Sequence, residues 1–325
     1  MRAMILAAGY GTRLWPLTID RAKPAIPFMG KPLVGYVAEY LARYGCDEVA
    51  VNLHHRPDSV RRALGDGSRF GVRLRYVEEP VILGTSGALD NAKSILDGDT
   101  FVVVNGKIAT DIDLSAALET HREMNALATL VLRPNEACER YSVVEVRDGK
   151  VVEFGGMPAP SDNAGREPLM FTGIQILEPR IFEYIPEGVF SHSTTEVYPQ
   201  AIARGETVAA HVAEGHWYEL STVQRYLETS LVLMAAEGRS VELGEGSSIA
   251  GGAEVSESVL WEGVRVGKGA RVRRAILGAG VVVNEDDVIE NAAVVRAELV
   301  AGSERPSKGL AGEVRGANFV APLPQ

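Results

Sequence analysis

The sequence predicts an α/β domain built on a mostly parallel β-sheet, followed by a parallel β-helix. Over the first two-thirds of the chain, short apolar runs alternate with helical patterns, which is typical of a sheet covered by helices. After residue 240 the pattern changes to a short repeat, in which an apolar residue recurs about every six positions. We therefore expect a first domain at residues 1–238, a β-helix at 239–302 and a loosely packed tail at 303–325.

The expected strands of the first domain are short apolar runs. Ala3–Ala8 and Phe101–Asn105 are apolar almost throughout, as expected of strands that are buried on both faces of a sheet. Tyr141–Phe154 contains two strand-like segments around Asp148-Gly149, which indicates a hairpin. Further strands are expected at Glu48–Leu53, Val72–Val77, Ala126–Leu132 and Phe171–Leu177, and around His211–Glu214 and Trp217–Leu220.

The expected helices carry apolar residues three and four positions apart. In Pro32–Tyr44, for example, Val34, Val37 and Leu41 share one face. A loop that leads into a helix is expected at Gly84–Ile95. The remaining helical segments are expected at Asp58–Leu64, Leu114–Glu123, Pro179–Tyr184, Thr195–Arg204 and Gln224–Ala236.

The repeat after residue 240 predicts stacked coils, each contributing short strands to a parallel β-helix. The alternative is an irregular β-rich tail. The step is six residues except for slips between Val255 and Val266 and between Val272 and Leu277. The apolar positions that define the repeat are Leu243, Ile249, Val255, Val266, Val272, Leu277, Val283, Ile289 and Val295.

Composition excludes several classes of protein. The chain has 325 residues, 46% of them hydrophobic, so it is not disordered, and its net charge of −10 argues against a nucleic-acid partner. Its two cysteines, Cys46 and Cys138, cannot form a disulfide framework, which indicates a reducing compartment. No apolar run has the length of a membrane span. We therefore expect a cytoplasmic protein without membrane partners.

The most informative segment is the glycine loop that follows the first strand. It reads Leu6-Ala-Ala-Gly-Tyr-Gly-Thr-Arg-Leu-Trp-Pro-Leu-Thr18, with Ala22-Lys23-Pro24 downstream. Gly9 and Gly11 allow the backbone to approach a ligand closely, and Arg13 and Lys23 supply positive charge for phosphate oxygens. The loop has neither the third glycine of a dinucleotide fingerprint nor the Gly-Lys-Ser/Thr of a Walker loop. We expect Trp15, beside this loop, to be partly exposed.

The loop resembles the G-x-G-T-R-L-x-P-L-T and K-P motifs of sugar-1-phosphate nucleotidyltransferases, and the resemblance covers most of the chain. The β-helix with Ser258–Trp261 is most similar to that of mannose-1-phosphate guanylyltransferases. The resemblance implies a Rossmann-like mixed, mostly parallel sheet and a left-handed β-helix. Other matching segments are Gly84–Leu89 (nucleoside loop), Val104–Leu114 (central strand end), Phe171–Ile174 (sugar pocket) and Trp217–Thr222.

The resemblance also implies roles for the matching residues. Arg13 and Lys23 would be the catalytic cations, and Glu79-Pro80 would fix the start of the nucleoside loop. Nucleotide and phosphate would bind at Leu6, Ala8, Gly9, Gly11, Thr12, Gly84, Thr85 and Gly87. The sugar pocket would contain Asn105, Gly106, Ser142, Thr172, Gly173 and Glu196. Glu196 could instead be an acid at a helix start, and Asp111 and Asp113 fit a helix N-terminus better than a metal site.

The family holds Mg²⁺ with two aspartates, and this sequence departs from the family at both positions. One is Lys107 and the other is Glu219, a longer carboxylate. The lysine that meets the sugar phosphate in the family is Met157 here, and Ser142 replaces a glycine. Lys107 can be interpreted in two ways: as loss of the metal, or as an ammonium that pairs with Glu219 and neutralises phosphate directly.

Two functions follow. The favoured one is an enzyme that joins a nucleoside triphosphate and a sugar-1-phosphate, with mannose-1-phosphate and GTP as the preferred pair. The alternative is a catalytically silent subunit that binds a nucleotide or nucleotide-sugar and assembles with identical or different subunits through the β-helix. Acyl transfer by the β-helix is disfavoured because residues 217–325 contain no histidine to act as a base.

Overall fold

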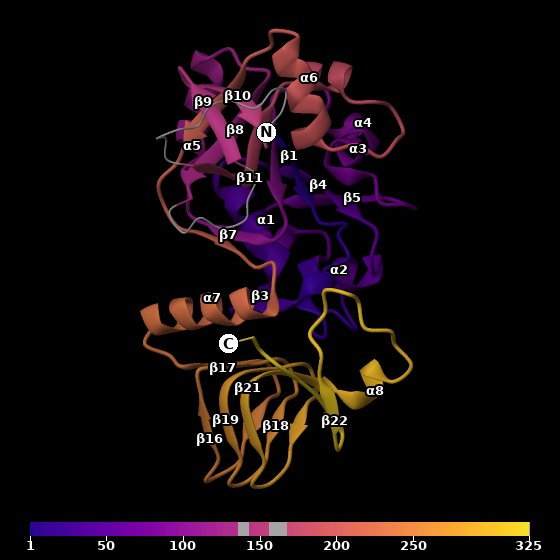
Figure 1. Cartoon of the computed structure of the whole chain (residues 1–325), viewed down its shortest axis with the longest axis vertical. Coiled ribbons are helices and arrows are strands. Elements are labelled where there is room, and N and C mark those ends of the chain that lie inside the picture. Colours follow the sequence, from indigo (N-terminus) through magenta and orange to yellow (C-terminus); the bar gives the residue numbers. More distant parts are fainter. Residues whose placement is uncertain (136–142, 156–167, 325) are drawn as a thin grey trace. The chain divides into compact units, whose positions relative to one another are not determined.

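The structure is a computed structural model that describes residues 1–135, 143–155 and 168–324 (Figure 1). The chain forms two compact units. The first unit contains Met1–Gly9, Val34–Pro57 and Leu64–Trp217, and the second contains Tyr10–Leu33, Asp58–Ala63 and Tyr218–Gln325. The glycine loop therefore begins in the first unit and continues in the second. None of the helices in the described ranges combines the length and apolar character that a bilayer crossing requires.

The described residues of the first unit build a nine-stranded mixed sheet in the order β5-β4-β1-β6-β11-β8-β12-β10-β9. The β1–β4, β4–β5, β1–β6 and β8–β12 pairs are parallel, whereas β11 is antiparallel to β6 and β8. The predicted alternation of strands and helices is confirmed. The strands are β1 (Arg2–Leu6), β4 (Glu48–Leu53), β5 (Arg73–Glu78), β6 (Phe101–Asn105), β8 (Ala128–Pro134), β9 (Val143–Arg147), β10 (Lys150–Phe154), β11 (Leu169–Leu177) and β12 (Val208–Val212).

The centre of this sheet is fully buried. Ala3, Met4 and Ile5 of β1 have no exposed surface, as the apolar run predicts. Helices cover the sheet because their apolar faces can be buried only against it. The helices with residues in this unit are α1 (Leu33–Arg43), α3 (Gly84–Asn91), α4 (Lys93–Leu96), α5 (Leu114–Glu123) and α6 (Tyr198–Ala203), with a 3₁₀ segment at Pro179–Tyr184 and a π-helical turn at Ser193–Val197.

A buried histidine ties α5 to the sheet. His121 is only 3% exposed; its Nδ1 lies 2.8 Å from the Thr129 hydroxyl and its Nε2 lies 3.0 Å from the Glu178 carboxylate. Burial lowers the pKa of His121, and the attraction of Glu178 only partly opposes this effect. Asp113 is the N-cap residue immediately before α5, and its carboxylate accepts the Ser115 backbone N–H at 2.9 Å. The predicted N-cap role of Asp113 is confirmed.

The second unit contains residues 58–63 of α2 (Pro57–Leu64), helix α7 (Val223–Ala236) and a stack of coils. Every parallel strand pair of the stack is offset by the same amount: Val241 pairs with Ser258, and Arg271 with Val288, each 17 residues later. One coil is therefore 17 residues long, with sides of six, six and five. The strands are β14 (Val241–Leu243), β15 (Ser248–Ile249), β16 (Glu254–Ser256), β17 (Ser258–Leu260), β18 (Arg265–Val266), β19 (Arg271–Leu277), β20 (Val282–Val283) and β21 (Val288–Arg296).

This register explains both slips in the apolar repeat. The first slip skips Leu260, which is buried in the core of the coils and pairs in register with Leu243 and Leu277. The second slip is the five-residue side of the next coil. The last position of the repeat is Val294 in this register, one residue before the Val295 of the sequence analysis. The predicted stack of parallel coils is confirmed.

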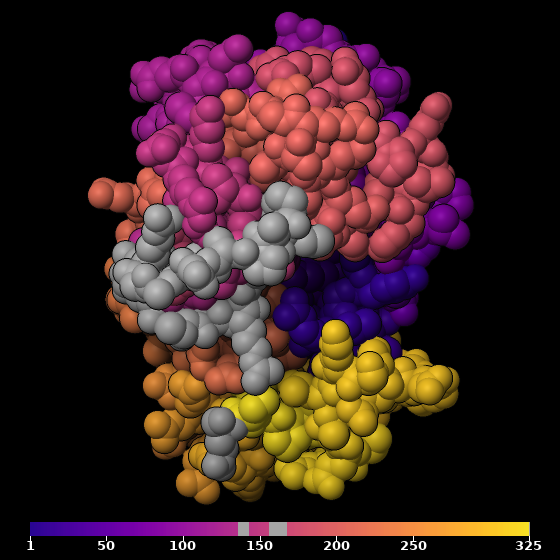
Figure 2. Space-filling view, turned by 45° about the horizontal axis from the view of Figure 1, so that its top comes forward, coloured from indigo at the N-terminus to yellow at the C-terminus, as the bar shows by residue number. Residues whose placement is uncertain are grey.

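The tail is more ordered than we expected. Helix α8 (Ala297–Val300) is followed by β22 (Glu313–Arg315) and β23 (Asn318–Pro322), and β23 pairs antiparallel with β21. Phe319 and Val320 are buried, so the expectation of a loosely packed tail is wrong for β23, whereas most of residues 303–317 are exposed. The periodicity of the sequence could not predict β23, because this strand pairs with the last strand of the coils and is not part of the repeat. The tail is the yellow part of the surface in Figure 2.

The lowered pKa of His121 predicts acid-sensitive stability. Because the folded-state pKa lies below the unfolded value, protonation favours unfolding, and stability is lost as the pH falls below the ordinary histidine range. From about pH 7.5 to about pH 5.5, chemical denaturation should show the free energy of unfolding fall by about 1 kcal/mol more in the wild type than in His121→Gln. Identical slopes for the two proteins would contradict this assignment.

Candidate nucleotide and sugar-phosphate site

In the first unit, a buried polar bridge fixes the start of the glycine loop. The Asn52 side-chain oxygen accepts the Ala7 backbone N–H at 2.6 Å, and its amide group donates to Glu79 Oε1 at 2.7 Å. Glu79 Oε2 then accepts the Leu83 backbone N–H at 3.0 Å. Both side chains are 3% exposed. The bridge thus connects the loop residues Leu6, Ala8 and Gly9 with the segment that begins at Gly84.

The part that Glu79 plays agrees with the expectation for Glu79-Pro80. Asn52 is a residue that the sequence analysis missed. Its only signal is a polar side chain between the apolar residues Val51 and Leu53 of β4. Such a residue needs a buried partner, because an unpaired buried amide is costly.

The predicted nucleoside loop is packed tightly against the segment before α6. A Cβ on Gly84, which has a φ of +77°, would lie 2.3 Å from the Ser191 carbonyl oxygen. A Cβ on Gly87 would lie 2.5 Å from the Val189 carbonyl oxygen. The Thr85 hydroxyl accepts the Ser193 backbone N–H at 2.8 Å. Only glycine allows this approach at positions 84 and 87.

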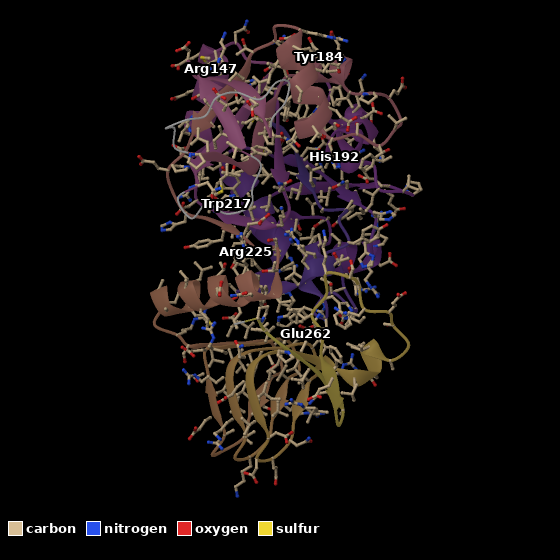
Figure 3. The ribbon with its side chains drawn as sticks, viewed as in Figure 1. Arg147, Tyr184, His192, Trp217, Arg225 and Glu262 are labelled. Carbon is tan, nitrogen blue, oxygen red and sulfur yellow. The ribbon has the colours of Figure 1, made fainter. Side chains whose placement is uncertain are left out.

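Glu196 lies at the same segment. Its carboxylate accepts the backbone N–H of His192 at 2.8 Å, and His192 is labelled in Figure 3. This contact agrees with the interpretation of Glu196 as an acid at a helix start. A role for its carboxylate toward a sugar hydroxyl stays a prediction.

Four of the predicted sugar-pocket residues, Asn105, Gly106, Thr172 and Gly173, lie where β6 and β11 run side by side. The Gly106 backbone N–H donates to the Leu6 carbonyl at 2.9 Å. A Cβ on Gly173, which has a φ of +83°, would lie 2.1 Å from the Asn105 amide nitrogen. The carbonyl of Thr172 accepts the indole N–H of Trp217 at 3.0 Å. Trp217 is labelled in Figure 3.

Several of the residues singled out in the sequence lie outside the described ranges, and one is buried in the core. Ser142 and Gly156-Met157-Pro158 lie outside the described residues, as does Cys138. Cys46 is buried, and burial raises the pKa of its thiol to about 11, so this cysteine is an unreactive core residue.

In the second unit, two turns carry the predicted cations. Gly11 has a φ of +66° and precedes the 3₁₀ turn Thr12–Leu14, which contains Arg13. Lys23 begins a second turn, Lys23–Ala25. A Cβ on Gly11 would lie 2.9 Å from the Cβ of Lys23, so the two turns are in direct contact.

The C-terminal tail packs against the segment that carries Arg13 and Lys23. The Trp15 ring packs edge-on against Phe319 with 5.3 Å between ring centroids, and the Trp15 carbonyl accepts the Leu310 N–H at 3.3 Å. Trp15 is therefore 4% exposed, and our expectation of partial exposure is wrong. The sequence could not reveal this burial, because it depends on a strand about 300 residues away in the chain.

The residues at the two metal positions do not fit a divalent cation. Lys107 follows β6 in the first unit, and its ammonium has no lone pair to donate. Glu219, in β13 (Trp217–Glu219), is 7% exposed; its Oε2 accepts the Ser221 hydroxyl at 2.9 Å and lies 3.3 Å from the Arg225 guanidinium (Figure 3). The predicted pairing of Lys107 with Glu219 stays a prediction.

The nearby aspartates have other partners. Asp111 Oδ2 lies 2.7 Å from His216 Nδ1, and hydrogen bonds from His216 outweigh burial and lower the pKa of Asp111. Asp113 caps α5. Within residues 1–135, 143–155 and 168–324 no group of three His, Cys, Asp or Glu side chains could hold a metal ion.

Comparisons with known families match both parts of the chain. A model of the nucleotidyl transferase family matches residues 2–235, and a model of the GlmU-like C-terminal hexapeptide region matches residues 204–298. A crystal structure of a candidate glucose-1-phosphate thymidylyltransferase from Bacillus anthracis is similar in fold, with a TM-score of 0.60 and 22% identity. The similarity covers 72% of this chain and 94% of that one.

Curated relatives act on different sugars. A UTP–glucose-1-phosphate uridylyltransferase of Synechocystis is 33% identical over 75% of this chain, and the match spans 66% of that protein. An N-acetylmuramate α-1-phosphate uridylyltransferase of Neisseria meningitidis is 34% identical, with coverages of 70% and 96%. A mannose-1-phosphate guanylyltransferase of Mycobacterium tuberculosis is 29% identical, with coverages of 71% and 64%.

The buried bridge at Asn52 predicts a large stability loss on its removal. Asn52→Leu leaves the Ala7 N–H and Glu79 Oε1 without this partner and should lower the free energy of unfolding by about 2–3 kcal/mol in urea denaturation. The matched control is Asn91→Leu, because Asn91 donates to the Glu78 carbonyl at an exposed position. The control should lose less than about 1 kcal/mol. Equal losses in the two variants would show that the buried bridge has no special role.

Proposed function

The chain belongs to the nucleotidyl transferase family, and on this premise we propose that it transfers a nucleotidyl group from a nucleoside triphosphate to a sugar-1-phosphate. The observation that carries the proposal is the contact between the Gly11 and Lys23 turns, which keeps the Arg13 and Lys23 segments together. Arg13 and Lys23 each bring a positive charge to these turns, and a triphosphate is a ligand whose negative charge complements them.

In the proposed reaction, an oxygen of the sugar-1-phosphate attacks the α-phosphorus of the triphosphate. The new P–O bond forms as the bond to pyrophosphate breaks, so no external oxidant or base is required. All reactants are anions, and catalysis consists mainly of positioning and charge neutralisation. Arg13 offers a planar guanidinium to two phosphate oxygens, and Lys23 offers a point charge. The backbone from Leu6 to Thr12, with Gly84, Thr85 and Gly87 in the first turn of α3, would line the nucleotide.

Relatives of this family typically use Mg²⁺, but the donor set at positions 107 and 219 does not fit a protein-held ion. We propose that the ammonium of Lys107 contributes charge neutralisation in place of that ligand. No step of the proposed reaction is assigned to a metal. Asn105, Gly106, Thr172, Gly173 and Ser142 would contact the sugar, with Glu196 as a further candidate.

The first substrate pair to test is mannose-1-phosphate with GTP. Support comes from relatives named as mannose-1-phosphate guanylyltransferases in Mycobacterium tuberculosis and Yarrowia lipolytica, 29% and 30% identical. Glucose-1-phosphate with UTP is the second pair, supported by the uridylyltransferase of Synechocystis. We further propose that the protein is cytoplasmic and that its domains meet near residues 238 and 302. We also propose that the coils form a left-handed β-helix and that copies of the chain associate through these coils.

A second candidate function is a silent regulatory subunit that binds a nucleotide or nucleotide-sugar without turnover. Lys107 favours it, because a cation replaces a carboxylate in the proposed centre. The two functions share the phosphate loop and differ in chemistry. Binding alone therefore cannot separate them, whereas pyrophosphate release can.

We expect the wild-type protein to release pyrophosphate with one pair from a panel of nucleoside triphosphates and sugar-1-phosphates. Lys107→Asp should lower this activity at low Mg²⁺ by about tenfold or more, because it replaces a cation by an anion beside phosphates. Lys31→Asp, at a lysine outside the proposed site, is the control. Absence of turnover with every pair, together with measurable GTP binding, would overturn the enzyme and favour the silent subunit. Activity gained only in Lys107→Asp would show that the lysine silenced the site.

A further inference from the structure

An ion pair connects the segment that carries Lys23 to the coils of the same unit. Arg21 lies two residues before Lys23, and its Nη2 donates to Glu262 Oε1 at 2.7 Å. Its guanidinium also bonds to Asp20 at 3.1 Å and stacks over the Trp261 ring at 5.0 Å from the centroid. The Arg21 side chain is 18% exposed and that of Glu262 is 46% exposed. Burial opposes the charge of Arg21, but the bonds to Asp20 and Glu262 outweigh it and raise its pKa.

The neighbouring residue of the coil holds the other end of the segment. The Trp261 indole N–H donates to the Tyr226 hydroxyl at 3.0 Å, and that hydroxyl donates to the Pro27 carbonyl at 2.5 Å. Trp261 is 2% exposed, so these contacts are fixed by packing. Two adjacent residues, Trp261 and Glu262, therefore hold the chain on either side of Lys23, at Arg21 and at Pro27.

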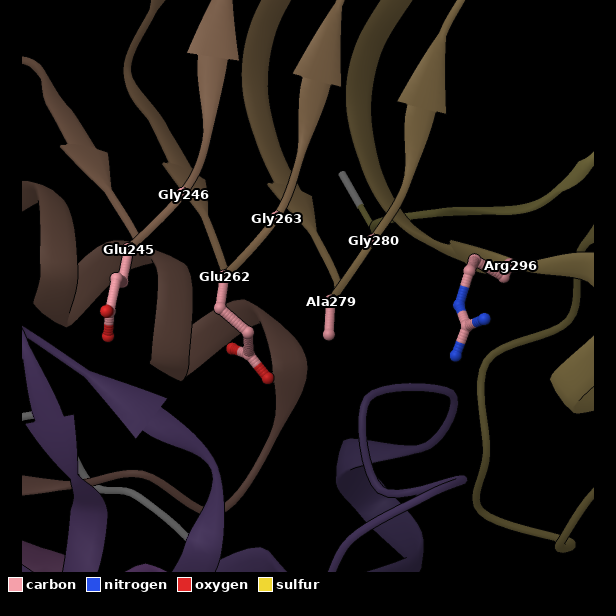
Figure 4. Close-up of a pocket in the computed structure, with 7 residues that line it drawn as sticks. All are labelled: Glu245, Gly246, Glu262, Gly263, Ala279, Gly280 and Arg296. Atoms are coloured by element: carbon pink, nitrogen blue, oxygen red, sulfur yellow. The ribbon is translucent and has the colours of Figure 1, made fainter.

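The ion pair is specific to one coil. Glu245, Glu262, Ala279 and Arg296 follow each other at the 17-residue spacing of the coils and line one cavity of about 470 Å³ (Figure 4). Figure 4 shows the Glu245 and Glu262 side chains on the same side of successive coils. Glu262 also lines a second cavity of about 310 Å³ with Asp20 and Arg21, and Glu245 does not. Glu245 thus has the same chemistry and repeat position without the contact.

We propose that Glu262 and Trp261 are positioning residues of the triphosphate site, and that they act by fixing the backbone from Arg21 to Pro27 so that Lys23 meets the phosphates. This inference rests on the proposed function. Through the contacts of Glu262 and Trp261, the coils would then support the triphosphate site as well as any assembly of subunits. Neither residue needs to touch the substrate.

The test is steady-state kinetics of pyrophosphate release with GTP and mannose-1-phosphate. Glu262→Gln preserves size and removes the charge, so the KM for GTP should rise by about two- to fivefold, the scale of a partly exposed ion pair. The kcat and the KM for mannose-1-phosphate should change less than about twofold, because Lys23 still reaches the phosphates once they are bound. Glu245→Gln should leave all three constants unchanged.

A double variant separates positioning from a general loss of structure. Arg21→Lys retains the charge but loses the stacking on Trp261 and the planar fork. If the pair acts as a unit, Arg21→Lys with Glu262→Gln should raise the KM for GTP little more than either change alone. The proposal would be overturned if the increases in the KM for GTP multiplied in the double variant, or if Glu245→Gln raised this KM as much as Glu262→Gln does. An unchanged KM for GTP in Glu262→Gln would also overturn it.

The same variants remain informative without turnover. If the wild-type protein processes no substrate pair, the proposed enzyme fails, and equilibrium dialysis with GTP still measures the positioning effect. A weaker Kd in Glu262→Gln, with an unchanged Kd in Glu245→Gln, would support positioning of a binding site. Equal Kd values for both variants and the wild type would overturn it.

Discussion

The proposed chemistry depends on the close contact between Gly11 and Lys23. A side chain at position 11 would lie within 2.9 Å of the lysine Cβ, so glycine is required for the two cation-bearing turns to touch. This segment is held by the buried side chains of Leu14, Trp15 and Leu17, and by the tail strand β23, whose Phe319 packs against Trp15. These apolar contacts do not depend on a bound ligand.

In the first unit, buried polar side chains hold the corresponding segments in place. Asn52 and Glu79 are buried, and each is satisfied by backbone or side-chain partners that belong to the proposed phosphate and nucleoside loops. A buried network of this kind has few alternative arrangements, because every broken hydrogen bond leaves a polar group without water. Gly84, Gly87 and Gly173 then allow neighbouring segments to approach closely.

Much of this architecture follows from local sequence patterns. The strands Glu48–Leu53 and Phe101–Asn105 and the helix Leu114–Glu123 were predicted with the bounds observed, because burial on a sheet or helix face leaves a period in the sequence. The 17-residue coil was visible as a repeat with slips. Partners far apart in the chain were not predictable: Asn52 with Glu79, Trp15 with Phe319, and Arg21 with Glu262, which are 241 residues apart. The roles of Ser142 and Met157 stay predictions.

The most direct test of the account is GTP binding to Gly11→Ala, measured by calorimetry without and with Mg²⁺. The new methyl group must separate the turns of Arg13 and Lys23, so the account predicts that the affinity falls by about tenfold or more. Gly238→Ala is the matched control, because Gly238 has a φ of +69° and open space around it, and this variant should bind GTP like the wild type. Unchanged affinity in Gly11→Ala would contradict the central claim that these two turns hold the triphosphate.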